Sequence, residues 1–446
     1  MKRLLFLIIN LNLVFLIIIN IAMAENREEN SVLQLGLDEV IKRAVDTNEG
    51  YKIKEQEVNK TDGVYGEARS NMLPHISAHY SRTYHIDSPA AMNLNDFEYS
   101  YGGGASQVIW SFGKVMYAVN SAKKAVEASR FNREASRQEI IFTAKLSYYS
   151  TLLAKNALSI TKESYTNTLQ NKKLLGQRSY GGRSPKYEIV RMDAQVASRV
   201  PAVNEAQTQF DVATETLKKL IDVDPASNIE LKGGFSQSYT DLDYEMLVAK
   251  MYKDEPSLKG LDKTVESADA RVKSSIAAFF PTVSAFSSLD YYKGSQMQAL
   301  MLRNEKLDRY LFAGLRVDIP IWEGGLKEAQ LAQAKADKEI SILKKKEVEK
   351  SLLLELKKAY LEYQQYKDNL KANIEAVNLA EEAFKQTQEM FASGQVTLTD
   401  LNDAEFLLTN QRLNKEMTLF NINITLARIE KLIAGQYDEQ NNDKKS

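Results

Sequence analysis

The chain has 446 residues, with 58 lysines and arginines against 59 aspartates and glutamates. This balance excludes the strongly basic surface of a nucleic-acid-binding protein, so we expect no nucleic-acid partner. The absence of cysteine excludes disulfides, thiolate chemistry, zinc held by sulfur and a lipid anchor on an N-terminal cysteine.

The chain begins with a segment typical of a secretory signal peptide. Lys2 and Arg3 precede an apolar run over residues 4–21, and the small-residue sequence Ala-Met-Ala follows at residues 22–24. We expect cleavage before Glu25 and export from the cytoplasm. A retained membrane anchor is the alternative, but asparagines interrupt the run at positions 10, 12 and 20.

Two short helices are expected over residues 37–47 and 51–72. After them the spacing of apolar residues changes from that of a helix to that of a strand. From His75 to Ile86 apolar and polar residues alternate, which predicts a strand with one apolar face. A second run over residues 99–110 returns beside it, giving a β-hairpin over about 75–110. The same pattern predicts a second β-hairpin over about 282–321.

Residues 114–175 and 326–393 contain neither glycine nor proline, so each stretch predicts one long helix. At ~1.5 Å per residue the second would be roughly 100 Å long. Return helices, expected over 184–221 and 399–433, make two helical hairpins with tips near Gly182 and Gly394. Apolar residues recur at multiples of seven in both long helices, as in a coiled-coil seam: Leu146, Leu153, Ile160 and Leu174, then Leu356, Tyr363, Leu370, Val377, Phe384 and Phe391.

The two hairpins are predicted to be copies of one unit. A constant offset of 212 residues relates Trp110 to Trp322, Tyr148 to Tyr360 and Gly182 to Gly394. Chance matches would not keep one offset across two helices and a turn, so we infer a tandem duplication. The chain then divides into a signal peptide (1–24), a first repeat (25–221), an equatorial connection (222–243), a second repeat (244–435) and a disordered tail (436–446).

The predicted strands suit a membrane. Each has about 10 to 12 residues, close to the length of a transmembrane β-strand, and tyrosines lie near the loop ends. Four strands cannot close a barrel, and lipid does not tolerate an open sheet edge, so a membrane location requires several chains to share one barrel. A small soluble sheet beside a helical bundle is the alternative.

From Leu37 to about Gly435 the sequence resembles the TolC family of outer-membrane efflux proteins. The most specific feature is the second tip, where residues 390–405 read MFASGQVTLTDLNDAE, similar to the family's glycine, threonine and Asp-x-x-Asp-Ala pattern. Residues 180–189 at the first tip are a looser match. Leu-Pro and Phe-Pro pairs ahead of the strands at residues 73 and 280, and Trp-x-x-Gly at Trp110 and Trp322, are further landmarks.

This resemblance implies a mainly α protein with membrane β-structure: a homotrimer whose chains share a twelve-stranded β-barrel in the cell outer membrane, in contact with lipid, continued by a trimeric α-barrel across the periplasm. It implies the passive exit duct of a tripartite efflux or type I secretion system. The implied partners are a periplasmic adaptor (membrane fusion) protein and an inner-membrane transporter of the RND, ABC or MFS type. A periplasmic coiled-coil adaptor or a structural coiled-coil protein is the alternative, although neither needs a duplicated hairpin with paired strands.

Asp400 and Asp403 are the candidate gate residues at the periplasmic entrance. Thr397-x-x-Asp400 also fits a capping box, which needs no further function. In the functional interpretation, three copies of both aspartates make an acidic constriction. The other tip residues are Gly182, Gly394, Phe391 and Glu188; in the duplication Glu188 stands opposite Asp400, but Arg191 stands opposite Asp403, so the two hairpins should differ.

We expect no enzyme, cofactor or metal. No nucleophile with a base, phosphate loop or carboxylate pair stands out. The histidines at 75, 79 and 85 share the polar face of one predicted strand, where His75 and His79 would lie ~13 Å apart. A pore-facing position explains them better than a metal site.

Overall fold

The computed structural model describes residues 33–84, 97–180, 186–236, 239–293 and 308–435. The expected signal peptide and tail, together with Gly182 and His85, lie outside these ranges. The chain forms two compact units, and each contains residues of both predicted repeats. The first, here called the sheet unit, comprises Lys52–Ala135 and Pro256–Ser351; the second, the hairpin unit, comprises the described residues of Met1–Tyr51, Ser136–Glu255 and Leu352–Ser446.

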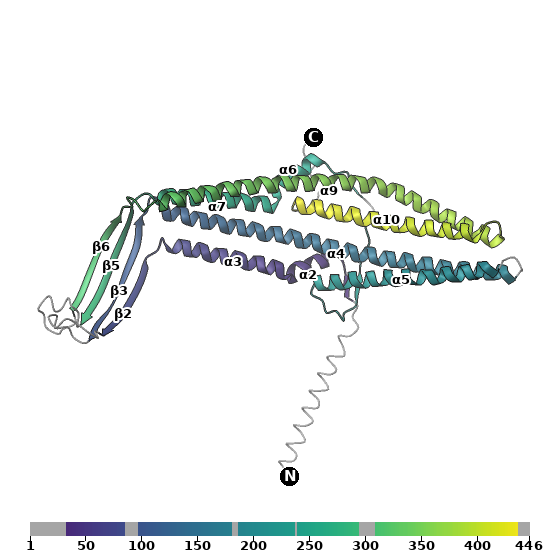
Figure 1. Ribbon diagram of the computed structural model, residues 1–446, viewed down its shortest axis with the longest axis horizontal. Helices are drawn as coiled ribbons and strands as arrows, with labels where there is room; N and C mark the ends of the chain where they lie inside the picture. The colour runs from purple at the N-terminus through teal and green to yellow at the C-terminus, as the bar shows by residue number, and fades with distance from the viewer. Residues whose placement is uncertain (1–32, 85–96, 181–185, 237–238, 294–307, 436–446) are drawn as a thin grey trace, which may run out of the picture. The chain divides into compact units, whose positions relative to one another are not determined.

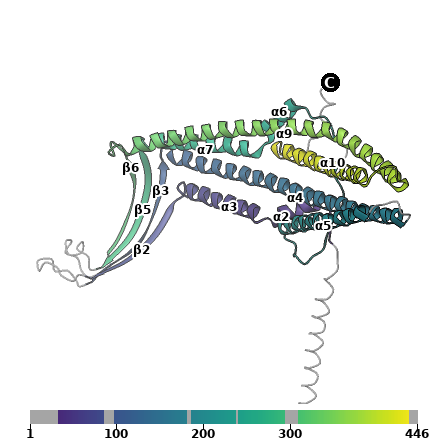
Figure 2. The same ribbon diagram turned by 45° about the vertical axis from the view of Figure 1, so that its right-hand side comes forward.

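The sheet unit contains one antiparallel sheet in the order β2-β3-β5-β6, and both views show its strands side by side (Figure 1, Figure 2). Both β-hairpins predicted from the alternating pattern are confirmed, and the pairing of β3 with β5 joins them. In the described chain, β2 and β6 each pair along one edge only. The strands are β2 (His75–Tyr84), β3 (Phe97–Trp110), β5 (Thr282–Lys293) and β6 (Asp308–Asp318).

The two faces of this sheet differ because side chains alternate along each strand. The register places apolar side chains on one face, and many of them are exposed: Ile76, Tyr80, Tyr101, Leu311, Leu315 and Val317. The opposite face carries small and polar residues on β2 and β3, with Asp290 on β5, and aromatic side chains toward β6: His75, Ser77, His79, Gly102 and Gly104, then Phe286, Tyr310 and Phe312. Every residue of β2 is exposed, so along this strand neither face of the sheet is covered by another described element.

The sheet unit contains the first parts of α4 (Lys114–Tyr180) and α9 (Leu326–Ser393). It also contains all of α7 (Pro256–Ala277) and all but the first turn of α3 (Glu49–Ser70). Small residues let α7 approach α4 closely, since a Cβ on Gly260 would lie 2.9 Å from Asn132 Oδ1. The Ser121 and Ser267 hydroxyls also donate across this contact, each to the other's carbonyl, at 2.9 and 2.8 Å. These hydrogen bonds satisfy polar groups where the two helices meet.

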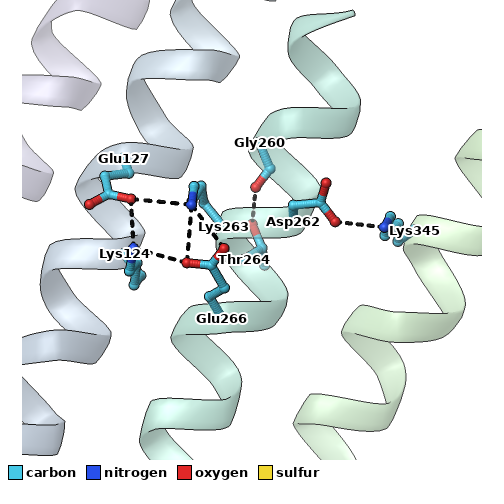
Figure 3. A network of polar contacts seen from close by, with 8 residues as sticks. All are labelled: Lys124, Glu127, Gly260, Asp262, Lys263, Thr264, Glu266 and Lys345. Atoms are coloured by element: carbon cyan, nitrogen blue, oxygen red, sulfur yellow. Dashed lines mark hydrogen bonds and ion pairs between the residues drawn. The ribbon is translucent and has the colours of Figure 1, made fainter. Parts of the chain in front are cut away.

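Ion pairs continue the same contact between α4 and α7 (Figure 3). Lys124 lies 2.9 Å from Glu266 and Lys263 lies 3.7 Å from Glu127, so charges of opposite sign alternate between the helices. On the other side of α7, Asp262 pairs with Lys345 of α9 at 2.6 Å. The hydrogen bonds that Lys124 donates to Glu266 and to Glu127 raise its pKa above the ordinary value, which keeps this ammonium charged.

The hairpin unit contains two helical hairpins, formed by α4 with α5 (Lys186–Leu220) and by α9 with α10 (Leu398–Leu432). The heptad residues predicted for α9 are all buried, and most of them pack against α10 or the core at the turn. The apolar seam of this hairpin is thus confirmed.

The seam predicted for α4 is only partly correct. Leu146, Leu153, Ile160 and Leu174 are half-buried, whereas the fully buried side chains nearby are Ala144, Tyr148 and Leu152, which recur every fourth residue. These residues pack on Leu217 of α5 and on Ile221, which directly follows that helix. The heptad pattern fails here because α4 also forms polar contacts with α10, so more than one face of the helix is covered.

Four short elements complete the hairpin unit: β1 (Leu33–Leu35), β4 (Ile229–Leu231), α2 (Leu37–Thr47) and α6 (Tyr244–Asp254). β1 and β4 pair in parallel, which joins the start of the first repeat to the connection between the repeats. The Tyr148 hydroxyl donates to the Lys232 carbonyl beside this pair. The sequence pattern predicts α2 but not the two strands, because three residues are too few to show a period.

Candidate functional site at the hairpin turns

Glycine and a capping box form the turn between α9 and α10. Gly394 has a φ of +85°, a left-handed conformation that glycine adopts without steric cost. The Gln395 amide donates to the Met390 carbonyl at 2.9 Å, which satisfies an otherwise free group at the end of α9. Thr397 then caps α10, as its hydroxyl accepts from the Asp400 amide at 3.2 Å.

Asp400 completes the capping box. Its Oδ2 accepts hydrogen bonds from the Thr397 hydroxyl at 2.7 Å and from the Thr397 amide at 2.8 Å. The hydrogen bond from the Thr397 hydroxyl lowers the pKa of Asp400 most, and the one from the Thr397 amide lowers it further. The stabilisation that this carboxylate gives α10 is therefore present above the ordinary pKa and is lost as the pH falls through the lowered one. The capping role of Asp400 predicted from sequence is confirmed.

Asp403 lies one helical turn further along α10 and is exposed to solvent, as Asp400 is. Residues three apart share one helix face, so the two carboxylates present charge on the same side of α10. Nothing within the described chain hydrogen-bonds or pairs with Asp403. Its charge is thus available to a neighbouring molecule or to ions.

The other predicted tip residues fall into different surroundings. Phe391 is fully buried in an apolar core with Leu175, Met192 and Leu401, so its role is packing between the hairpins. Glu188 is half-buried in the first turn of α5, and Gly182 lies outside the described residues.

Arg191 makes the two turns unlike each other, as the duplication indicated. Its guanidinium donates to the Thr399 hydroxyl at 3.0 Å and to the Tyr187 hydroxyl at 3.2 Å. The first hairpin therefore places a cation at the start of α10, where the second hairpin carries its two aspartates.

A buried carboxylate, Glu405, is the main residue that the sequence analysis missed. Its side chain pairs with the Arg199 guanidinium and accepts a hydrogen bond from the Ser164 hydroxyl. Thr409 donates to the same carboxylate at 3.0 Å. Only 2 % of Glu405 is exposed, so this cluster joins α4, α5 and α10 away from water. The sequence contains an indication of this buried charge. Glu405 occupies a position in the apolar stripe of α10 that contains Leu398, Leu401 and Leu408.

Further polar contacts between α4 and α10 extend from Glu405 along both helices. Arg412 reaches Glu163 at 2.7 Å and also Glu381 of α9 at 3.3 Å. Beyond it lie the pairs Asn156–Glu416 at 2.7 Å, Lys145–Glu430 at 2.5 Å and Glu139–Lys431 at 2.7 Å. The α4–α10 contact between the two hairpins is therefore rich in charge, whereas α9 and α10 meet through an apolar seam. Separating a contact made by charged side chains exposes less apolar surface to water than separating an apolar seam. The free-energy cost of parting α4 from α10 is therefore lower in this respect.

The profile of the family described as "Outer membrane efflux protein" matches residues 42–222 and 247–435. The chain belongs to this family. Among curated efflux-family relatives, the probable outer membrane lipoprotein SilC of Salmonella typhimurium is 20% identical over 375 residues, which cover 82% of this chain and 78% of SilC. The solvent efflux pump outer membrane protein SrpC of Pseudomonas putida is 21% identical over 403 residues, which cover 86% of this chain and 82% of SrpC.

The fold of this efflux-family chain is that of solved outer-membrane channels. The CmeC channel of Campylobacter jejuni superposes with a TM-score of 0.78 at 17% identity, covering 92% of this chain and 88% of CmeC. The resemblance to the TolC family is thereby confirmed, and the family is one of efflux channels, not of enzymes. No described helix has both the length and the apolar character needed to cross a membrane. Nor do the described residues contain a group of three or more His, Cys, Asp or Glu side chains that could hold a metal ion.

Proposed function

We propose that this outer-membrane efflux protein is a trimeric channel in which three copies of the four-stranded sheet close one twelve-stranded barrel. The observation that carries the proposal is the sheet itself, which has an exposed apolar face and two strands with unpaired edges in the described chain. Lipid can cover the apolar face, but each unpaired backbone group left in lipid costs several kcal/mol. Pairing β2 of one copy with β6 of the next removes every edge.

In this proposal the helices continue the barrel through the periplasm, and the channel is the passive exit duct of a tripartite efflux or type I secretion system. An inner-membrane transporter supplies the energy, and a periplasmic adaptor protein engages the hairpin turns. A channel that conducts passively takes its choice of substrate largely from such partners. The exposed turn residues and the charged contact between the hairpins support an entrance that another protein can open.

The first prediction concerns assembly. Purified in detergent, the protein should have the mass of three mature chains. Leu315 lies on the exposed apolar face. Leu315→Arg should make the free energy of membrane insertion less favourable by ~2–4 kcal/mol, because arginine would lie in lipid. Ser77→Arg, on the opposite face, is the matched control and should insert and assemble. Light scattering of the detergent-solubilised protein measures the mass, and a stable soluble monomer would contradict the proposed channel.

The second proposal concerns the gate. Three copies of Asp400 and Asp403 around the axis would hold six carboxylates in a narrow mouth, which attracts cations and repels anions. Both carboxylates are exposed, and that of Asp400 is held in its charged form, which supports this role. Capping and gating are compatible, because the cap fixes the carboxylate at the first turn of α10.

Neutralising the gate should change ion selectivity but not the fold. Asp400→Asn with Asp403→Asn keeps side-chain oxygens that can cap α10 while it removes the negative charge. Single-channel recordings in a planar bilayer should then show weaker cation selectivity and weaker block by multivalent cations. Glu375→Gln with Glu382→Gln removes as many charges from exposed positions of α9 and should leave both properties unchanged. If the aspartate variant keeps wild-type selectivity and block, these aspartates are caps only.

A further inference from the structure

A histidine and an aspartate face each other across a glycine in the sheet. The register pairs His79 of β2 with Gly102 of β3, and Gly102 with Asp290 of β5. Because Gly102 has no side chain, the Asp290 carboxylate lies over the middle strand, and a Cβ at residue 102 would clash with Asp290 Oδ1. His79 Nε2 lies 3.5 Å from this oxygen.

The Asp290 carboxylate is buried and only half satisfied. The residue is 5% exposed, and its Oδ2 accepts a hydrogen bond from the Ser288 hydroxyl at 2.7 Å. Within the described chain, Oδ1 has no hydrogen-bond partner. A buried carboxylate oxygen without a hydrogen-bond partner is costly. This oxygen lies beside an imidazole, so one ligand could be shared by both groups.

We propose that His79 and Asp290 together bind a divalent transition-metal ion, with Zn²⁺ as the simplest probe. Imidazole and carboxylate are suitable ligands for zinc, at bond lengths of about 2.0–2.2 Å. Two ligands at that distance and at a tetrahedral angle lie about 3.4 Å apart, close to the 3.5 Å between His79 Nε2 and Asp290 Oδ1. A direct hydrogen bond between nitrogen and oxygen would be shorter, at about 2.9 Å.

The surroundings fit such an ion. Ser288 fixes the carboxylate through its second oxygen, as partners of metal-binding carboxylates commonly do. The His79 side chain is 53% exposed, so water can reach the metal and complete its coordination. Both residues lie on the small and polar face of the sheet. The location of the site inside a water-filled barrel rests on the proposed function, whereas metal binding itself does not.

Zinc titration of the full-length, detergent-purified protein tests this proposal. After treatment with a chelator, calorimetry should detect one Zn²⁺ per chain at this site, and zinc X-ray absorption should show nitrogen and oxygen ligands without sulfur. His79→Gln and Asp290→Asn should each weaken binding about tenfold or more. Gly102→Ala should do the same, because its Cβ would clash with Asp290 Oδ1 and with the backbone of β5 and so displace the carboxylate.

The matched control is His75→Gln, which changes the histidine four residues away on the same face, ~13 Å along the strand. It should retain zinc binding, and so should the Asp400→Asn, Asp403→Asn variant, which alters the other candidate cation site. Trimer mass and circular dichroism establish that each variant folds, and His79→Gln, at a half-exposed position, remains informative if Asp290→Asn does not. Equal zinc affinity in the wild type and His79→Gln would overturn the proposal, as would loss of binding in His75→Gln alone. The titration needs no conductance, so failure of the channel proposal and failure of this site give separate results.

Discussion

Arg199→Ala is expected to lower the free energy of unfolding by ~3–5 kcal/mol. The substitution leaves Glu405, which is 2% exposed, as a buried carboxylate without its cation. The hydroxyls of Ser164 and Thr409 would still donate to it, but they carry no charge to balance it. Urea unfolding followed by circular dichroism measures the loss.

Two control variants separate the buried charge from a general effect of losing arginine. Arg191→Ala removes an exposed arginine that donates to Thr399 and Tyr187, and it should cost no more than about 0.5 kcal/mol. Arg199→Met combined with Glu405→Leu removes both charges and fills the space with apolar groups, so it should recover most of the stability. If Arg199→Ala and the double variant are equally unstable, an unpaired charge is not the cause.

The same cluster bears on the proposed gate, because Arg199, Ser164 and Glu405 come from three helices of two hairpins. If these contacts hold the entrance closed, Arg199→Ala should also raise the resting single-channel conductance. Arg191→Ala then serves as the control near the turn. Unchanged conductance in a correctly assembled Arg199→Ala trimer would restrict the cluster to stability.

Leu370→Asp should be at least as damaging, with a loss of roughly 4 kcal/mol or more in the free energy of unfolding. Leu370 is 5% exposed and belongs to the apolar core that includes Leu419 and Ile422 of α10. Aspartate there would be an unpaired charge in an apolar seam. Urea unfolding and the mass of the assembled protein measure the effect.

Positions on the same helix provide the comparison for Leu370. Val377→Asp, at another buried position of the stripe, should behave like Leu370→Asp. Lys385→Asp, at an exposed position, should change the free energy of unfolding by no more than about 0.5 kcal/mol. Equal tolerance at all three positions would show that the seam does not stabilise the hairpin.

Local pattern in the sequence determined much of this protein. The period of seven placed the buried stripe of α9, alternation placed the strands, and Thr-x-x-Asp placed the cap of α10. Each of these patterns reflects an interaction between residues a few positions apart, or one face of an element against a single partner, so a short window of sequence contains it. The buried stripe of α4 was harder to predict, because that helix contacts more than one neighbouring helix.

Tertiary structure alone decided which distant residues meet. Glu405 is separated in sequence from Ser164 by 241 residues and from Arg199 by 206, yet the three form one buried cluster. The sequence indicated a charge in an apolar stripe but not its partner. Likewise, alternation placed His79 on the polar face of a strand, whereas the meeting with Asp290 depends on the pairing of β3 with β5 and on the missing side chain of Gly102. Such contacts depend on the register between elements far apart in the chain, which side-chain periodicity within one element does not specify.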